Sequence, residues 1–122
     1  MILLVDVLPR ADFDAWLEQA RRPAADPADA FAKRGQEVFM SNACVLCHTI
    51  RGTTAQGQVG PDLTHLASRK GLAANSYPNS TAYLEGWVTH AQTMKPNAQM
   101  PDVTAFTGDD LRALVAYLEG LK

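Results

Sequence analysis

The sequence predicts an all-α domain that follows a short strand and a helix. Apolar side chains recur every three or four residues in three stretches, residues 27–40, 81–93 and 108–121, and this spacing is typical of amphipathic helices. Only residues 1–8 are rich in β-forming side chains, and Pro9 ends that stretch. Strands and helices therefore do not alternate as they do in proteins that are built on a parallel sheet.

The first 28 residues are predicted to form an appendage and a linker. Residues 1–8 are expected to be a strand and residues 10–21 a helix. The apolar side chains of that helix share one face: Phe13, Trp16, Leu17 and Ala20. We expect the side chain of Trp16 simply to pack against apolar neighbours. Residues 22–28 have the proline-rich composition of a linker, and Asp26 and Pro27 suit the cap and first residue of the next helix.

The main domain is predicted to span residues 29–122. Its first helix ends near Met40 and has an apolar face that comprises Phe31, Gly35, Val38 and Phe39. Asp62 is expected to cap a short helix over residues 63–70, which Gly71 closes. Residues 71–80, rich in asparagine and serine, are expected to form a loop.

Two further helices complete the domain. Residues 81–93 place one set of apolar side chains on a common face: Tyr83, Leu84, Trp87, Val88 and Ala91. The last helix is predicted to begin at the cap Thr107, with Asp109 and Asp110 in its first turn, where the helix dipole favours negative charge. Its apolar stripe comprises Leu111, Leu114, Val115, Leu118 and Leu121, beside which lies Tyr117.

Residues 44–48 read CVLCH and contain both cysteines of the chain. Two thiols at this spacing, followed at once by a histidine, are the attachment signature of c-type haem. Each sulfur can add to one haem vinyl group, and the imidazole of His48 can then bind the iron. A redox-active dithiol would require a strand–helix alternation that is absent here, and a zinc site would require two more close ligands.

Residues 95–101 read KPNAQMP and offer a second iron ligand. Prolines on both sides stiffen the loop that carries Met100, because each fixes its φ angle. A thioether ligand favours ferrous iron and so raises the reduction potential. Met94 is the main rival to Met100 but lacks a proline on each side, and Met40 is expected to fill space in the core.

Composition and charge limit the classes of function. The 122 residues are 47% hydrophobic and carry a net charge of −2, without a long basic run, so nucleic acid is an unexpected partner. No stretch is long enough to span a bilayer, and residues 1–8 lack the basic region of a secretory signal. Because haem c is attached outside the cytoplasm, we expect the chain to be a fragment of a longer, exported protein.

Three motifs resemble those of class I cytochromes c: CVLCH at 44–48, GPDL at 60–63 and KPNAQMP at 95–101. The resemblance covers residues 29–122. The sequence is most similar to the cytochrome c domain fused to subunit II of caa3-type cytochrome c oxidases. Asn97 departs from the family, which often has glycine at that position. Asparagine tolerates left-handed backbone better than most residues do.

The resemblance implies one covalent haem c and several residues around it. The carbonyl of Pro61 would orient the haem histidine, and Gly35 with Phe39 would cross the last helix closely. Arg69 would neutralise a haem propionate, although a solvated surface arginine is an equal alternative. Trp87 would pack on the haem and donate to a propionate, or would simply fill the core. The two remaining histidines, His65 and His90, are expected to be ordinary residues.

The resemblance also suggests a place for the first 21 residues. They are similar to the last strand and closing helix of the copper domain of oxidase subunit II. The cysteine pair of that copper centre is absent from this chain, which therefore cannot bind the centre alone.

Electron transfer is the function that these observations favour. By resemblance, the chain is a carrier rather than a catalyst: it would accept electrons from a small soluble donor and pass them to the dinuclear copper of its parent oxidase. Basic residues near the haem edge are few, namely Arg51 and Lys95, so we expect a weakly charged docking surface. The alternatives are a gas-binding or enzymatic haem protein, a free-standing cytochrome and a subunit of another dehydrogenase.

Overall fold

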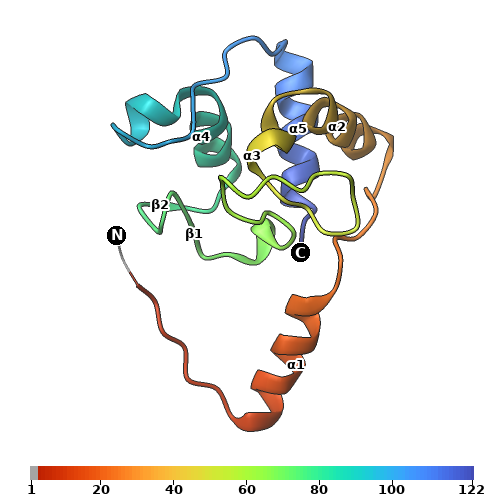
Figure 1. Ribbon diagram of the computed structural model, residues 1–122, viewed down its shortest axis with the longest axis vertical. Helices are drawn as coiled ribbons and strands as arrows, with labels where there is room; N and C mark the ends of the chain where they lie inside the picture. Colours follow the sequence, from red (N-terminus) through yellow and green to blue (C-terminus); the bar gives the residue numbers. More distant parts are fainter. Residues whose placement is uncertain (1–2) are drawn as a thin grey trace.

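The computed structural model describes residues 3–122, and it confirms an all-α domain with a small sheet. The helices are α1 (Arg10–Arg21), α2 (Ala30–Ser41), α3 (Cys44–Cys47), the 3₁₀ turn η1 (Leu66–Ser68), α4 (Thr81–Met94) and α5 (Gly108–Glu119). The strands β1 (Gly71–Leu72) and β2 (Tyr77–Pro78) pair antiparallel, with Leu72 opposite Tyr77. Figure 1 shows α2 crossing α5 on one side of α3, and α4 on the other.

The crossing of α2 and α5 depends on Gly35. A Cβ atom at this position would lie 1.9 Å from the carbonyl oxygen of Ala113 and 2.8 Å from Cβ of Tyr117. No side chain fits such a gap, so the two backbones touch only because the residue is glycine. Phe39 and Tyr117 pack edge to face one turn further on, with ring centroids 6.2 Å apart. The predicted close crossing is confirmed.

The main core joins α2, α4 and α5 to the loop that follows α3. Its largest fully buried side chains include Tyr117, Phe39, Ile50, Leu114 and Leu121. Thr107 caps α5 as predicted, since its side chain accepts a hydrogen bond from the amide of Asp110. Helix α4 contains a kink at His90, whose backbone is not helical.

The N-terminal appendage differs from its prediction in one element. Helix α1 has the predicted bounds, but no strand forms over residues 3–8, and residues 1–2 lie outside the described part of the chain. A strand needs a neighbour to pair with, and β-rich composition alone supplies none. The segment instead passes near the residue before β1, since the carboxylate of Asp6 accepts a hydrogen bond from Lys70 Nζ at 2.8 Å.

Two predicted helix starts were wrong. Asp29, not Asp26, caps α2, because its carboxylate accepts a hydrogen bond from the amide of Ala32 at 2.8 Å. Asp62 does not cap a helix over residues 63–70. Its carboxylate accepts from both the amide and the hydroxyl of Thr64, which closes a local turn, and only η1 is helical in this segment.

The segment over residues 71–80 is more ordered than a plain loop. It forms the β1–β2 hairpin, and Gly71 belongs to β1 instead of ending a helix. Ala73, Ala74 and Asn75 make the turn with positive φ angles of 51°, 61° and 62°. Two alanines in the left-handed region are uncommon, which is why composition did not indicate this turn.

Candidate haem site

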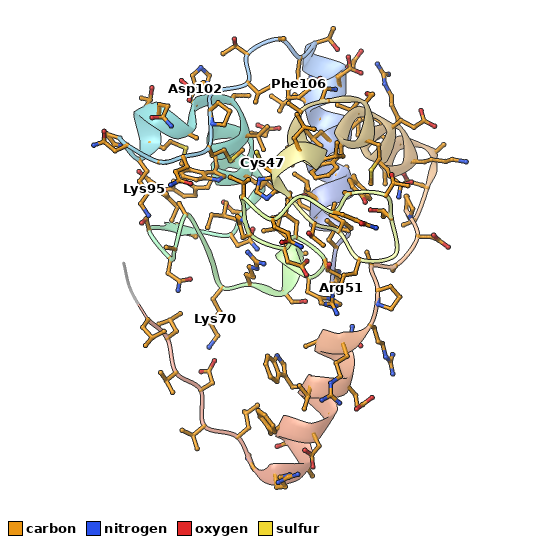
Figure 2. All side chains as sticks on the ribbon, in the orientation of Figure 1. Cys47, Arg51, Lys70, Lys95, Asp102 and Phe106 are labelled. Carbon is orange, nitrogen blue, oxygen red and sulfur yellow. The ribbon has the colours of Figure 1, made fainter. Side chains whose placement is uncertain are left out.

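A cavity of about 950 Å³ lies at the centre of the domain, and apolar side chains form most of its wall. Helices α2, α4 and α5 contribute Phe39, Leu84, Val88, Leu114 and Leu118. The sequence-predicted residues Cys44, Cys47, His48 and Met100 all line this cavity. The fold therefore brings two distant segments of the chain to one site, and Figure 2 shows Cys47 between α4 and the pair α2 and α5.

The two cysteines stand at the ends of the single turn of α3. Residues three apart in a helix share a face, so both thiols can reach one ligand. Both are free thiols and partly buried. Burial, with a smaller contribution from the nearby Cys47, raises the pKa of the Cys44 thiol above its ordinary value, despite a backbone hydrogen bond that lowers it.

His48 follows α3 directly and is held by the next loop. Its Nδ1 atom lies 2.8 Å from the carbonyl oxygen of Pro61. A carbonyl can only accept, so Nδ1 carries the proton and Nε2 keeps a free lone pair for a metal. Gly60 lies against the same ring, since a Cβ atom there would be 2.6 Å from its Cε1. The loop thus sets both the tautomer and the position of the imidazole.

The Met100 loop is fixed by a residue that the sequence did not indicate. Gln92, on α4, donates hydrogen bonds from Nε2 to the carbonyl oxygens of Ala98 and Met100, both at 2.6 Å. The backbone amide of Gln92 donates to the carboxylate of Asp102 at 2.8 Å. A glutamine on a helix is ordinary in sequence, so no pattern marks this role. Asn97 adopts a φ angle of 66°, as its tolerance of left-handed backbone allows.

Met94 does not share this site. Its sulfur lies over Gly86 on its own helix, 3.1 Å from where a Cβ atom there would be, and Met94 is not part of the cavity wall. Met40 packs against the core, as predicted. Of the methionines in the described part of the chain, Met100 is therefore the one that lines the cavity together with His48.

Comparison with known proteins agrees with this geometry. The sequence model of the family described as cytochrome c matches residues 32–122. The chain belongs to the cytochrome c family. Because covalent haem c defines that family, Cys44 and Cys47 are its attachment residues in this cytochrome c. The large apolar cavity, with both thiols on its wall, fits such a flat, mostly apolar group.

Curated relatives of this cytochrome c carry one name. It is 33% identical over 115 residues to cytochrome c oxidase subunit 2 of Alkalihalophilus pseudofirmus. The matched region covers 94% of this chain and 33% of that protein. It is 30% identical over 122 residues to the protein of the same name from Bacillus sp. (strain PS3), with the same two coverages. The chain thus spans about a third of the length of these relatives. None of the helices within residues 3–122 is long and apolar enough to cross a membrane.

The other sequence-predicted residues of the cytochrome c divide into two groups. Arg69 and Trp87 line the cavity, and Arg69 also donates a hydrogen bond to the carbonyl of Asp62. His65 and His90 lie away from the cavity wall. The ring nitrogens of His65 lie 2.8 Å from the carbonyl of Lys122 and 3.1 Å from that of Arg22, while Nδ1 of His90 lies 2.7 Å from the hydroxyl of Thr89.

Proposed function

We propose that this cytochrome c domain transfers electrons, with His48 and Met100 as the two axial ligands of its haem. Haem c supplies a one-electron ferric–ferrous couple when it is bound. The observation that carries the proposal is the placing of His48, with its Nε2 lone pair free, and Met100 on one cavity wall. With both axial positions filled, the iron has no open site for a substrate, which distinguishes a carrier from an enzyme or a gas-binding protein.

The partner that we propose is a haem-copper cytochrome c oxidase of the caa3 type. Its support is the shared name of the relatives, of which this chain covers one third. In this proposal residues 1–21 end a preceding copper domain, residues 22–28 are a linker and residues 29–122 are the cytochrome domain. Electrons pass from a small soluble donor to the dinuclear copper centre. The site of action is outside the cytoplasm, in a respiratory complex anchored in the membrane by its parent subunit.

The surface of α1 fits an origin in a larger assembly. None of its residues is buried, and the exposed rings of Phe13 and Trp16 pack against each other at a tilt, with centroids 5.7 Å apart. The segment before it exposes Leu3, Val5 and Val7 as well. An apolar face of this kind is unusual on a free protein and is typical of a surface that another domain covers.

The donor is proposed to dock on a weakly charged, apolar surface. Leu46 and Val59 line the cavity, yet each is 71% exposed, so both present apolar atoms at its mouth. The cations on the cavity wall are engaged within the chain: Lys95 donates from Nζ to the carbonyl of Ala73 at 2.7 Å, Lys70 pairs with Asp6, and Arg69 donates to the carbonyl of Asp62. Arg51 lies off this wall and binds the end of α1. Little net charge is therefore left to steer a charged donor.

Arg69 and Trp87 complete the proposed site. Arg69 has an exposed guanidinium at the cavity wall, where it can pair with a propionate. Trp87 is half-buried on the same wall and has one N–H to donate. Replacing Arg69 with methionine tests the first role, because a lost propionate contact should change the pH dependence of the reduction potential.

The native reading frame upstream of the codon for Ile2 tests the oxidase assignment. We expect it to continue into a β-rich domain with two cysteines, histidines and two membrane spans. A frame that begins there with a secretory signal would contradict the assignment, and would favour a free-standing cytochrome or a subunit of another dehydrogenase.

Donor kinetics test the docking surface. We expect the rate of reduction by a soluble donor cytochrome to change little as ionic strength rises from about 0.01 to 0.15 M, since few exposed charges are available to be screened. A Leu46→Asp variant should slow the reaction, while Lys33→Asp on α2 should not. A steep fall of the wild-type rate with added salt would contradict the apolar surface.

A further inference from the structure

Arg51 holds the C-terminal end of α1 against the haem domain. Its Nη2 donates a hydrogen bond to the carbonyl of Ala20 at 2.6 Å, and its Nη1 donates to that of Arg21 at 3.1 Å. The last carbonyls of a helix have no partner within the helix, and a cation there is also favoured by the helix dipole. A residue thirty positions further along the chain therefore caps α1.

The start of the linker is held at the same place. The amide of Ala24 donates to the carbonyl of Arg51 at 2.9 Å, and a ring nitrogen of His65 lies 3.1 Å from the carbonyl of Arg22. Pro23 packs on Gly52, where a Cβ atom would be 2.9 Å from Cβ of the proline. Gly52 has a φ angle of 91°, which favours glycine and permits this close approach.

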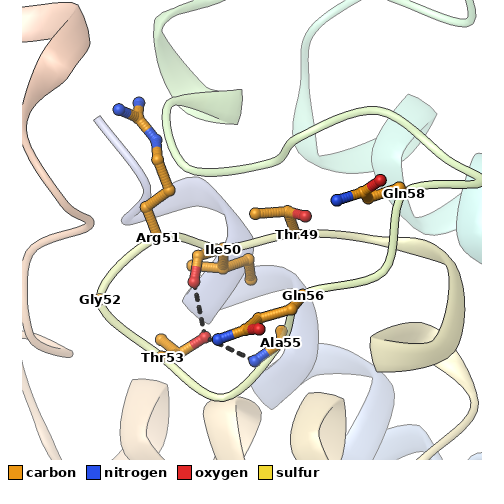
Figure 3. A pocket seen from close by; sticks show the side chains of 8 residues that line it. All are labelled: Thr49, Ile50, Arg51, Gly52, Thr53, Ala55, Gln56 and Gln58. Carbon is orange, nitrogen blue, oxygen red and sulfur yellow. Dashed lines mark hydrogen bonds between the residues drawn. The ribbon is translucent and has the colours of Figure 1, made fainter.

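The loop that carries Arg51 is rigid. The hydroxyl of Thr53 donates to the carbonyl of Ile50 at 2.7 Å and accepts from the amide of Ala55 at 3.1 Å, as Figure 3 shows. Thr49 and Gln56 pair across the loop as a β-bridge. In the same view, Arg51 points away from the loop, on the side of α1. The backbone that carries the Arg51 guanidinium is thus held in place by contacts within its own loop.

The same guanidinium also contacts the segment that orients the haem histidine. Nε of Arg51 lies 3.3 Å from a carboxylate oxygen of Asp62, and the preceding residue, Pro61, accepts the hydrogen bond from His48. One side chain therefore connects the end of α1 with the loop that orients His48. Flexible linkers of this length allow a wide range of positions, whereas these contacts allow one.

We propose that Arg51 is a positioning residue that fixes α1, together with any domain that precedes it, in one orientation relative to the haem. His65 and the packing of Pro23 on Gly52 support the same contact. The consequence for a preceding domain rests on the proposed function; the fixed orientation of α1 does not. In an oxidase, Arg51 would then set the distance between the haem and the copper centre that receives its electrons.

The test uses the holoprotein of this chain labelled with ¹⁵N. Ferric low-spin haem produces amide shifts that depend on direction and distance, so the difference between ferric and ferrous spectra reports the orientation of α1. We expect the wild-type shifts of α1 to fit a single orientation, with order parameters of about 0.85, as in rigid backbone. In Arg51→Met the haem-induced shifts of α1 should fall at least twofold, and its order parameters below about 0.6.

Two controls separate positioning from general damage. Arg10→Met removes the exposed ion pair that Arg10 forms with Asp14 on α1, and it should leave the shifts unchanged. His65→Gln should loosen α1 partly and gives a second variant if Arg51→Met folds poorly. Mobile α1 amides in the wild type, or unchanged shifts in both variants, would overturn the proposal. A failure of the proposed function would appear instead in the haem ligation of the wild type, which its absorption spectrum reports independently of α1.

Discussion

The Nδ1 atom of His48 lies 2.8 Å from the carbonyl oxygen of Pro61. This bond determines which ring nitrogen is protonated and so leaves Nε2 as the only one able to bind a metal. Because Pro61 and Gly60 belong to one short loop, that loop both orients the imidazole and presses against it.

Gly60→Ala should disturb the haem histidine directly. The added methyl group would lie 2.6 Å from Cε1 and 2.8 Å from Nδ1 of His48, so the ring or the loop must move. We expect a changed reduction potential and a high-spin component in the ferric absorption spectrum. Gly86→Ala is the matched control, because its methyl group meets only the flexible end of Met94 at 3.1 Å. Equal spectra for both variants would show that the contact has no effect on the site.

Met100→Leu should lower the reduction potential. Leucine keeps the volume but removes the sulfur ligand that favours ferrous iron, and we expect a fall on the order of 0.1 V within the range that axial ligands set. Met94→Leu should leave the potential unchanged, since Met94 lies off the cavity wall. Potentiometric titration of the three proteins measures both effects. A lowered potential in Met94→Leu alone would assign the ligand to Met94.

Gly35→Ala should destabilise the fold without a direct effect on the ligands. The methyl group would lie 1.9 Å from the carbonyl oxygen of Ala113, which forces α2 and α5 apart. Overpacking of this kind costs about 1–3 kcal/mol. Urea unfolding measures it, with Gly108→Ala as the control, because the nearest atom to that methyl group is 3.4 Å away. Equal stability of the two variants would mean that the helices separate at little cost.

Asp62 should stabilise the protein except at strongly acidic pH. Partial burial alone would raise the pKa of this carboxyl, but hydrogen bonds from Thr64 and the charges of Arg51 and Arg69 outweigh it and lower the pKa below its ordinary value. The contribution is therefore full above the unfolded value of about 3.9 and is lost as pH falls through the lower folded value.

Asp62→Asn checks this sign. Since the side chain is 45% exposed, we expect the variant to lose less than about 1 kcal/mol of unfolding free energy at pH 7. Its difference from the wild type should narrow as the pH falls below about 4. Asp14→Asn, which removes an exposed ion pair with Arg10, is the control. A gap that widens as pH falls would contradict the lowered pKa.

Much of the site was predictable because its chemistry is local in sequence. The spacing of Cys44, Cys47 and His48 indicates haem c without any structure, and the prolines around Met100 mark its loop. The clamp formed by Gln92 was not predictable, because its partners Ala98 and Met100 carry no pattern that points to it. The contacts of Arg51 with α1 were missed for the same reason, since they join segments about thirty residues apart.

The wrong predictions also have physical reasons. Residues 1–8 have the composition of a strand, but within residues 3–8 no second strand pairs with them. Asp26 and Asp29 are both good caps in sequence, and only the register of α2 chooses between them. Asp62 precedes an apolar run like a helix cap, yet its bonds to Thr64 close a tight turn first. Strand pairing, helix register and a local turn, respectively, decided these three cases.

Carbon monoxide binding tests the central claim, that His48 and Met100 fill both axial positions. The ferrous holoprotein at neutral pH, without denaturant, is titrated with carbon monoxide while the haem absorption is followed. We predict no binding by the wild type and ready binding by Met100→Leu, because only the variant has an open position. Ready binding by the wild type would contradict the account and would mean that this domain is not a simple electron carrier.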